Sequence, residues 1–174
     1  MTVVTEARTI RIVGLDLSMT ATGICGADGD TVTVKTKAVG DRRLVDITGA
    51  VLAIADGCDL AVIEDLPTHA KSAGITGMVH GAVRAALIRA FIPYVLITPA
   101  SVKKFGTGKG NAGKPEMAVA LFKRAGLELG DDNQVDAFWL RAMGMEQYGQ
   151  PVVQVPALNR AALTVVKGWP EVAL

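Results

Sequence analysis

The stretch that decides the fold is "IRIVGLDLSMTATGI", residues 10–24, in which Asp16 interrupts an otherwise apolar run. A short apolar run bounded by a polar turn is typical of a buried strand. Burying a lone carboxylate costs on the order of several kcal/mol unless it has a partner or a metal ion. The same combination returns in "LAVIEDLP", residues 60–67, where Glu64 closes a second apolar run. Two such strands together favour a functional site over two unrelated exceptions.

Length and composition indicate one domain with a single core, since the chain has 174 residues and half of them are hydrophobic. No apolar run approaches the roughly 18 residues that span a bilayer, so no membrane association is expected. The opening "MTVVTEARTI" lacks the charged and apolar regions of a secretory signal. Cys25 and Cys58 have no metal or redox spacing, which favours reduced core residues in a cytoplasmic protein.

The distribution of charge is more informative than the net charge of +1, which alone argues against a nucleic-acid partner. Between Leu66 and Leu127, nine basic residues face a single acid, Glu116, so this segment carries +8 and the remainder carries −7. Such a segment would hold a polyanion, although ordinary solvated lysines would give the same count. The basic residues are Lys71, Arg84, Arg89, Lys103, Lys104, Lys109, Lys114, Lys123 and Arg124.

Hydrophobic periodicity predicts strands and a hairpin first, then alternating helices and strands, which is typical of an α/β fold with a mixed sheet. The strands are expected at 9–16, in a hairpin over 22–37 that turns near 27–30, and at 60–65 and 93–98. The helices are expected at 42–55, 77–92, 115–127 and 131–149, with Asp131 or Asp132 as the last N-cap. We expect a polar connection at 67–76, a mobile Gly- and Lys-rich loop at 99–114, an edge strand at 151–156 and a short helix at 159–166.

Two further carboxylates, Asp132 and Asp136, are four residues apart and therefore share one helix face. Like charges at this spacing repel each other unless a cation lies between them. With Asp16 and Glu64 they form an all-oxygen set without His or Cys neighbours, which suits Mg²⁺ or Mn²⁺ rather than zinc. Two such ions about 3.5–4 Å apart promote in-line attack of water on a phosphodiester. The alternative is separate roles, with one N-cap, one solvated helix residue and two water-facing strand ends.

The motifs "GLDLSMTATGI", "AVIEDLP", "SVKKFGTGKGNAGK" and "DDNQVDAFWL" occur in an order that resembles RuvC-type Holliday-junction resolvases, most of all those of bacteriophages. The resemblance covers about residues 10–149 of a single domain over 1–174, and leaves 150–174 as a C-terminal extension. It implies an α/β, ribonuclease-H-like fold with a five-stranded mixed sheet flanked by helices on both faces. It also implies a homodimeric, Mg²⁺-dependent DNA endonuclease of the crossover-junction type, in the cytoplasm of a bacterium or phage-infected host.

The resemblance also implies roles for individual residues. Asp16 matches the carboxylate that bridges two Mg²⁺ or Mn²⁺ ions, while Glu64 and Asp136 match its strand and helix partners. For the fourth ligand the family has an acid or His three residues before the last Asp, where this chain has Asn133. Asp132 stands beside it and is the better Mg²⁺ ligand, so the choice between these two residues stays open. Lys103 and Lys114 match lysines that stabilise charge at the scissile phosphate. The DNA-binding residues implied are Lys71, Lys103, Lys104, Lys109 and Lys114.

One departure from the family lies in the loop after Glu64, which often carries an aromatic residue that wedges into the junction. This loop, "LPTHAKSAGITG", has no Phe, Tyr or Trp. Either Leu66, His69 or Ile75 substitutes, or the junction opens differently. The substrate therefore stays open among four-way junctions, replication forks and flaps.

An apolar stripe runs along the predicted helix at 77–92, where a packed core is the default interpretation. Part of this stripe could also form the dimer contact that the resemblance implies. The stripe consists of Met78, Val79, Val83, Leu87 and Phe91, and His80 in the same helix is expected to be packed or at an interface.

Two other classes of function remain as alternatives. "DLSMTATG" could serve as the phosphate loop of an actin- or sugar-kinase-type nucleotide-binding module, although that fold needs two such domains. A catalytically inactive junction-binding protein is the second alternative, against which the presence of all four acids counts. Gly108, Gly113 and Lys114 have P-loop spacing, but Pro115 stands where Ser or Thr is needed.

Overall fold

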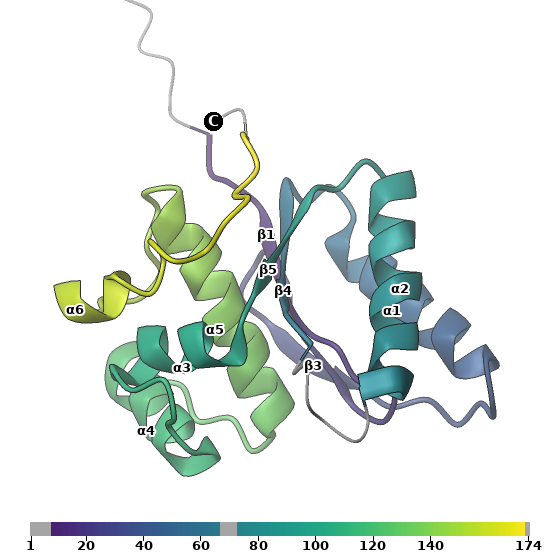
Figure 1. The fold of residues 1–174 in the computed structure, drawn as a ribbon, viewed down its shortest axis with the longest axis horizontal. Helices are drawn as coiled ribbons and strands as arrows, with labels where there is room; N and C mark the ends of the chain where they lie inside the picture. Colours follow the sequence, from purple (N-terminus) through teal and green to yellow (C-terminus); the bar gives the residue numbers. More distant parts are fainter. Residues whose placement is uncertain (1–7, 67–72, 173–174) are drawn as a thin grey trace, which may run out of the picture.

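The computed structural model describes residues 8–66 and 73–172 as one five-stranded sheet between two layers of helices (Figure 1). This is the α/β fold with a five-stranded mixed sheet and helices on both faces that was expected from the sequence. The strands are β1 (Ile12–Asp16), β2 (Thr22–Cys25), β3 (Thr31–Val34), β4 (Leu60–Glu64) and β5 (Tyr94–Ile97). The helices are α1 (Arg42–Ala55), α2 (Ala73–Arg89), α3 (Pro99–Thr107), α4 (Lys114–Ala125), α5 (Asp132–Gln147) and α6 (Ala157–Arg160).

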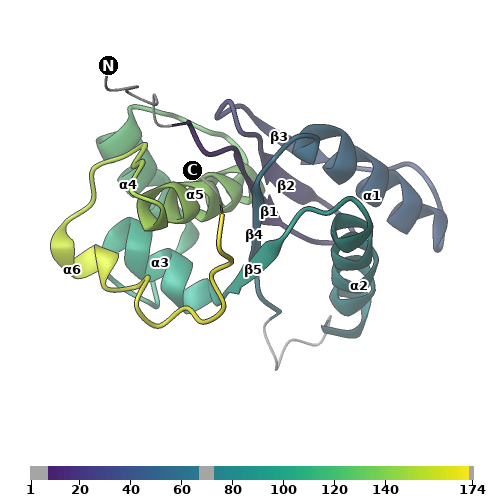
Figure 2. The ribbon, with the colours of Figure 1, turned by 90° about the horizontal axis from the view of Figure 1, so that it is seen from above.

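The sheet has the strand order β3-β2-β1-β4-β5. The first three strands form an antiparallel meander, whereas β4 pairs with β1 and β5 pairs with β4 in parallel. Figure 2 shows the strands in this order. The pairings mean that four of them, β1, β3, β4 and β5, point the same way and end at one edge of the sheet. In open sheets with parallel strands this edge is where ligands usually bind, because the connecting loops leave a crevice there.

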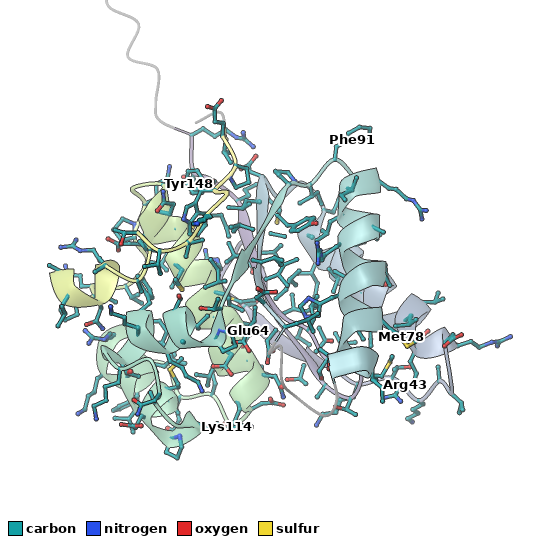
Figure 3. All side chains as sticks on the ribbon, in the orientation of Figure 1. Arg43, Glu64, Met78, Phe91, Lys114 and Tyr148 are labelled. Atoms are coloured by element: carbon teal, nitrogen blue, oxygen red, sulfur yellow. The ribbon has the colours of Figure 1, made fainter. Side chains whose placement is uncertain are left out.

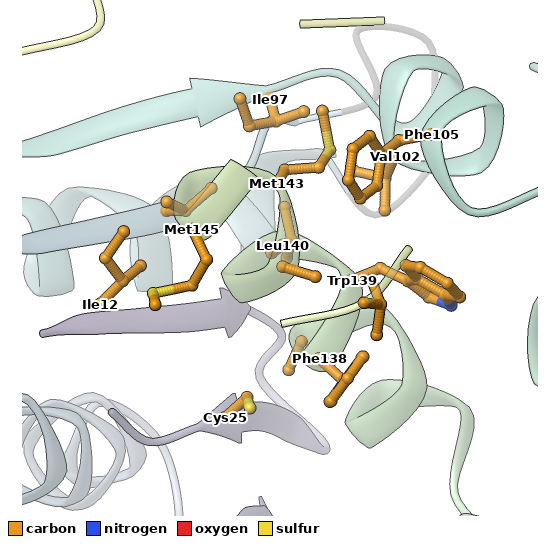
Figure 4. Close-up of a cluster of buried hydrophobic side chains, with 14 of the residues drawn as sticks. Ile12, Cys25, Ile97, Val102, Phe105, Phe138, Trp139, Leu140, Met143 and Met145 are labelled. Atoms are coloured by element: carbon orange, nitrogen blue, oxygen red, sulfur yellow. The ribbon is translucent and has the colours of Figure 1, made fainter. Parts of the chain in front are cut away.

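Alternate residues of the central strands face two separate hydrophobic clusters, as the period of two requires. Val13 and Leu15 of β1 face the layer formed by α1 and α2. Ile12 of β1 and Val62 of β4 face the layer of α3, α4 and α5 (Figure 4). Gly14 and Asp16 belong to the same face as Ile12, so the acid at the end of β1 points toward the layer that contains α5.

Helix α5 packs unusually close to the sheet, because glycines occupy the points of contact. A Cβ atom on Gly14 would lie 2.1 Å from the carbonyl oxygen of Ala137, and one on Gly23 would lie 2.0 Å from that of Asn133. Side chains at either position would collide with the helix backbone. The two glycines thus fix the position of the first half of α5 over β1 and β2.

The segment 99–114 is not the mobile loop expected from its glycines and lysines, because its first nine residues form α3. The side chain of Thr98 caps the helix by accepting a hydrogen bond from the backbone N–H of Ser101, and Pro99 fits the first turn. Val102 and Phe105 are buried on one face, and Phe105 meets the ring of Trp139 edge-on at 6.1 Å. Tertiary burial therefore outweighs the local composition.

Three smaller expectations also differ from the structure. Helix α2 begins at Ala73, so the end of the expected connection at 67–76 is helical. Residues 151–156 form no strand. Val153 and Val155 are buried in the cluster on the α5 side of the sheet, and the backbone carbonyl of Gln154 accepts a hydrogen bond from the Arg124 side chain rather than from a neighbouring strand. The helix expected at 159–166 is a single turn, α6, at 157–160.

Other expectations are confirmed. Cys25 and Cys58 are free and buried, and Trp139 is fully buried. The hairpin turns over residues 26–30, and Asp131 caps α5 by accepting a hydrogen bond from the N–H of Asn133. Within the part of the chain that is described, no helix is both long and apolar enough to cross a membrane.

Candidate active site

Two carboxylates stand side by side where β1 and β4 end. The parallel register pairs Leu15 with Ile63, so Asp16 and Glu64 follow at neighbouring positions on adjacent strands. Strands in a sheet lie about 4.8 Å apart, and both residues belong to the face covered by α5. Glu64 lies at the end of the sheet between the two helical layers (Figure 3).

Helix α5 brings a third carboxylate, Asp136, to the same edge. The backbone of Asn133 packs on Gly23, which lies opposite Asp16 in the β1–β2 pair, and that of Ala137 packs on Gly14. Asp136 lies between these two contact points on the first turns of the helix. The charge of Asp136 accordingly raises the pKa of Asp16, and the charges of Asp16 and Asp136 both raise the pKa of Glu64.

The pKa values of the three acids are raised, and burial is the largest cause in each case. Burial and the charge of Asp136 raise the pKa of Asp16 to about 7. Burial and the charge of Asp16 raise the pKa of Glu64 to about 8, and burial raises that of Asp136 to about 6. Three partly buried acids that repel one another are poorly compensated by the protein, which is typical of a site that takes up a cation.

Two lysines supply the positive charge nearest to these acids. Lys103, on α3, lowers the pKa of Glu64 and of Asp136, although burial outweighs it at both. Lys114, the first residue of α4, lowers the pKa of Asp16 and of Asp136. The two lysines predicted from the sequence thus lie within electrostatic range of the predicted acids, and Lys114 lies at the same end of the molecule as Glu64 (Figure 3).

The fourth predicted acid, Asp132, is half exposed and forms an ion pair with Lys114, with 2.9 Å between Nζ and Oδ2. This pair raises the pKa of Lys114. The alternative ligand, Asn133, donates its side-chain N–H to the carboxylate of Asp131 at 2.7 Å. Both candidates are therefore engaged with other residues. Of these two residues, only Asp132 is charged, and its charge raises the pKa of Asp136.

The chemistry of the donor set fits Mg²⁺ or Mn²⁺, because it consists of carboxylate oxygens whose charges repel one another. Within residues 8–66 and 73–172, however, no three His, Cys, Asp or Glu side chains lie close enough together to hold a metal ion as placed. Ligation of one ion by Asp16, Glu64 and Asp136 would therefore require their side chains to rotate from the positions described. The backbone already gathers the three residues at one edge of the sheet.

The other predicted DNA-binding and wedge residues are placed less centrally. Lys104 is half-buried on α3, and exposed Lys109 forms an ion pair with Glu116 at 3.1 Å. Leu66 lies two residues after Glu64, the last residue of β4, and Ile75 is exposed in the first turn of α2. Lys71 and His69 lie outside the described residues.

Sequence reasoning missed a second group of charges beside the site. Asp131 raises the pKa of Asp16 and is itself bonded to Thr33 of β3 at 2.8 Å. Exposed Lys35, directly after β3, lowers the pKa of Asp131. Since β3 ends at the same edge as β1, residues 35–43, "KTKAVGDRR", leave the sheet next to the acids. The sequence has four basic residues and one acid in this segment. The net charge of −7 outside residues 66–127 hides this local positive charge.

The raised pKa values predict that the metal-free protein loses stability as the pH rises. An unfolded Asp titrates near pH 4, whereas Asp16 in the folded protein titrates near 7, so the folded state retains a proton that the unfolded state has released. The stability that this group contributes is therefore fully present below about pH 4. It is lost progressively as the pH rises from about 4 to about 7. We expect Asp16→Asn, which avoids this loss, to be more stable than the wild type at about pH 8 by on the order of a few kcal/mol.

Thermal denaturation in a metal chelator, from about pH 4 to about pH 8, measures this difference. The two proteins should have similar midpoints at the acidic end and diverge above it. A constant difference across the range would show that Asp16 does not titrate as described.

Comparison with known proteins supports the fold. No protein-family model matches the chain, and no curated protein matches it. A structure of Thermus thermophilus RuvC has 22% identity and a TM-score of 0.64, covering 83% of this chain and all of that one. T. thermophilus RuvC in complex with Holliday junction substrate has 22% identity and a TM-score of 0.65, covering 84% of this chain and all of that one. The chain therefore has a RuvC-like, ribonuclease-H-like fold.

Proposed function

From this fold and its edge of buried acids, we propose that the protein is a divalent-metal-dependent, structure-selective DNA endonuclease. It would resolve Holliday or other branched junctions by hydrolysing phosphodiesters to 5′-phosphate and 3′-hydroxyl ends, as one domain of the phage RuvC-like branch in a bacterial cytoplasm. The observation that carries the proposal is that Asp16, Glu64 and Asp136, from β1, β4 and α5, lie at the same edge of the sheet and all have raised pKa values. The solved neighbour with junction DNA supports the substrate class.

Asp16, Glu64, Asp132 and Asp136 would hold two Mg²⁺ or Mn²⁺ ions in the proposed site. Bound divalent ions there would supply an activated water and neutralise charge on the phosphodiester. Asp132 would have to exchange its ion pair with Lys114 for this role. Lys114 would then be available to the phosphate, where positive charge stabilises the transition state.

The lysines would fix the DNA backbone on either side of the acids. Lys103 and Lys104 on α3 and Lys114 on α4 would contact phosphates nearest the cut, with Lys109 further along. Lys71 is proposed as a phosphate contact from the sequence alone. Lys35 and Lys37, which are exposed after β3, would contact the backbone on the other side of Asp16. Such contacts position the duplex without reading its sequence, which suits an enzyme that selects DNA by shape.

The proposed assembly is a homodimer formed through the outer face of α2. Ile75, Met78 and Ile88 lie on this face. Their side chains are 46–61% exposed, whereas large apolar side chains are usually buried in the core. Gly81 lies among them, and a Cβ atom there would meet nothing within 4 Å among the described residues, so its small size is not needed for packing against them. A second copy of α2 that crosses at Gly81 would bury all three apolar side chains. Of the predicted apolar stripe, Val79, Val83 and Leu87 are buried in the core instead.

We expect Met78→Asp to convert the dimer into a monomer, because it places a charge in the centre of an apolar contact. Sedimentation velocity at micromolar concentration measures the change. Val119→Asp provides the matched control, since Val119 is 51% exposed on α4, away from α2. A wild type that sediments as a monomer, or a loss of the dimer in the control alone, would contradict this interface.

The function itself is tested by cleavage of synthetic four-way junctions, forks, flaps and linear duplex DNA with Mg²⁺ or Mn²⁺. Cutting of branched substrates in preference to the duplex is the expected result. Junction binding without cutting under either metal would support the inactive binding protein. Binding of ATP with all DNA left uncut would support the nucleotide-binding module instead.

A further inference from the structure

The C-terminal segment, residues 150–172, packs across the helical layer that contains α5 (Figure 1, yellow). Val153, Val155 and Ala162 are buried in the core on that side of the sheet. Tyr148, at the end of α5, donates a hydrogen bond to the carbonyl of Pro170, and its ring meets Trp169 edge-on. The segment that lies beyond the family resemblance is therefore an integral part of the fold.

Within this segment Asn159 makes a contact that reaches the candidate site indirectly. Asn159 is 4% exposed, and its side-chain N–H donates to the backbone carbonyl of Phe105, in the last turn of α3, at 2.8 Å. Its amide oxygen also lies against Gly108, the left-handed C-cap of α3. The two residues are 54 positions apart in the chain, so this hydrogen bond joins the C-terminal segment to α3.

The bond satisfies one of the free carbonyls at the end of α3. The last carbonyls of a helix have no partner within the helix and must find one elsewhere. Gly108 N–H bonds to the carbonyl of Lys104, and Arg124 on α4 donates to that of Gly106 at 3.2 Å. The carbonyl between them, of Phe105, is the one that Asn159 takes up.

Helix α3 also holds Lys103, whose charge acts on Glu64 and Asp136. The start of the helix is fixed by the Thr98 cap directly after β5, so the direction of its axis depends on how its far end is held. That end is held by Arg124 and Asn159. A small change in the tilt of α3 would move the Lys103 ammonium relative to the acids.

We propose that Asn159 is a positioning residue that keeps Lys103 directed at the phosphate to be cleaved, so that the C-terminal segment contributes to the site through α3. The inference rests on the proposed nuclease function. An amide suits this position because it offers a donor to the carbonyl of Phe105, whereas a carboxylate of the same shape offers only acceptors and would repel it.

The test is a double-mutant cycle between Asn159 and Lys103, measured as single-turnover cleavage of a four-way junction at saturating enzyme. We expect Asn159→Asp to lower the cleavage rate about tenfold, which corresponds to about 1.4 kcal/mol, while junction affinity changes less than about twofold. In the Lys103→Ala background the same substitution should lower the rate by less than about twofold, because it acts through a side chain that is no longer there. Residues that act independently would instead give additive losses.

Arg160→Ala is the matched control. Arg160 is the next residue in α6 and is half exposed, with an ion pair to Glu146 at 3.5 Å. This variant should cleave at the wild-type rate. Thermal midpoints of all variants separate lost folding from lost positioning, and Asn159→Ser provides a second, milder change at the same site.

Each outcome decides the inference. Coupling between Asn159 and Lys103 supports it. Additive losses, an unchanged rate for Asn159→Asp, or the failure of both Asn159 variants to fold would overturn it and make Asn159 a purely structural residue. A wild type that leaves every branched substrate uncut would overturn the proposed function itself, which is a different result from any of these.

Discussion

The Asp16→Asn variant is expected to bind a four-way junction with wild-type affinity and to cut it about a thousandfold more slowly in Mg²⁺. Asp16 is the acid at which the charges of Asp136, Asp131 and Lys114 all act, so it occupies the centre of the electrostatic site. Removing its charge would weaken the hold on both proposed ions, and metal ions contribute several kcal/mol of transition-state stabilisation. A loss of about 4 kcal/mol corresponds to a thousandfold lower rate.

Gel-shift assays in Ca²⁺ and single-turnover cleavage in Mg²⁺ measure the two effects separately. Asp56→Asn is the matched control, because Asp56 is an exposed carboxylate just after α1 that precedes the start of β4, whereas Glu64 lies at the other end of that strand. It should bind and cut as the wild type does. If Asp16→Asn retained more than about a tenth of the wild-type rate, the two-ion site proposed around Asp16 would be wrong.

The second large effect is expected from Gly23→Ala, although Gly23 is neither charged nor a proposed ligand. The new Cβ atom would lie 2.0 Å from the backbone oxygen of Asn133, so the first turn of α5 would have to move away from β2. Because backbone cannot yield as a flexible side chain does, we expect a loss of about 3 kcal/mol of stability, at the upper end for overpacking. For a domain of this size that lowers the melting temperature by about 6–12 °C.

The cleavage rate of Gly23→Ala should fall by more than its loss of folding stability explains. Asp136 lies three residues after Asn133, so displacement of the first turn of α5 moves this acid away from Asp16 and Glu64. A misplacement of about 1 Å can cost roughly a hundredfold in rate. The rate is measured at about 25 °C, where the variant is still folded.

Gly49→Ala is the control for this prediction, since Gly49 lies within α1 and a Cβ atom there meets nothing within 4 Å. It should stabilise the protein by about 0.5–1 kcal/mol, because alanine favours helix more than glycine does. Equal behaviour of the two alanine variants would show that α5 does not depend on close approach to β2.

The strands that carry Asp16 and Glu64 could be predicted from the sequence because they depend on local pattern. The apolar runs that end in Asp16 and Glu64 identified β1 and β4, and the parallel register then placed the two acids side by side. The pattern of residues 131–149 indicated a helix with Asp131 or Asp132 as its N-cap, and Asp131 proved to be the cap. In these elements local propensity and tertiary packing agree.

The errors arose where long-range contacts decide the structure. Helix α3 has three glycine or lysine residues in its last five positions, so composition indicated a loop. Burial of Phe105 against Trp139 and the bond from Asn159 to its carbonyl come from residues more than thirty positions away. The ion pair between Lys114 and Asp132 was likewise not visible, because it joins α4 to α5 across a turn.

The buried contact between Phe105 and Trp139 gives the protein an optical reporter of its own. The chain has two tryptophans, and Trp139 touches α3 while Trp169 belongs to the C-terminal segment. In a Trp169→Phe background, the emission wavelength of Trp139 would therefore report changes in the packing of α3 against α5 in real time. Stopped-flow fluorescence could then register whether this packing changes when substrate arrives, without any attached dye.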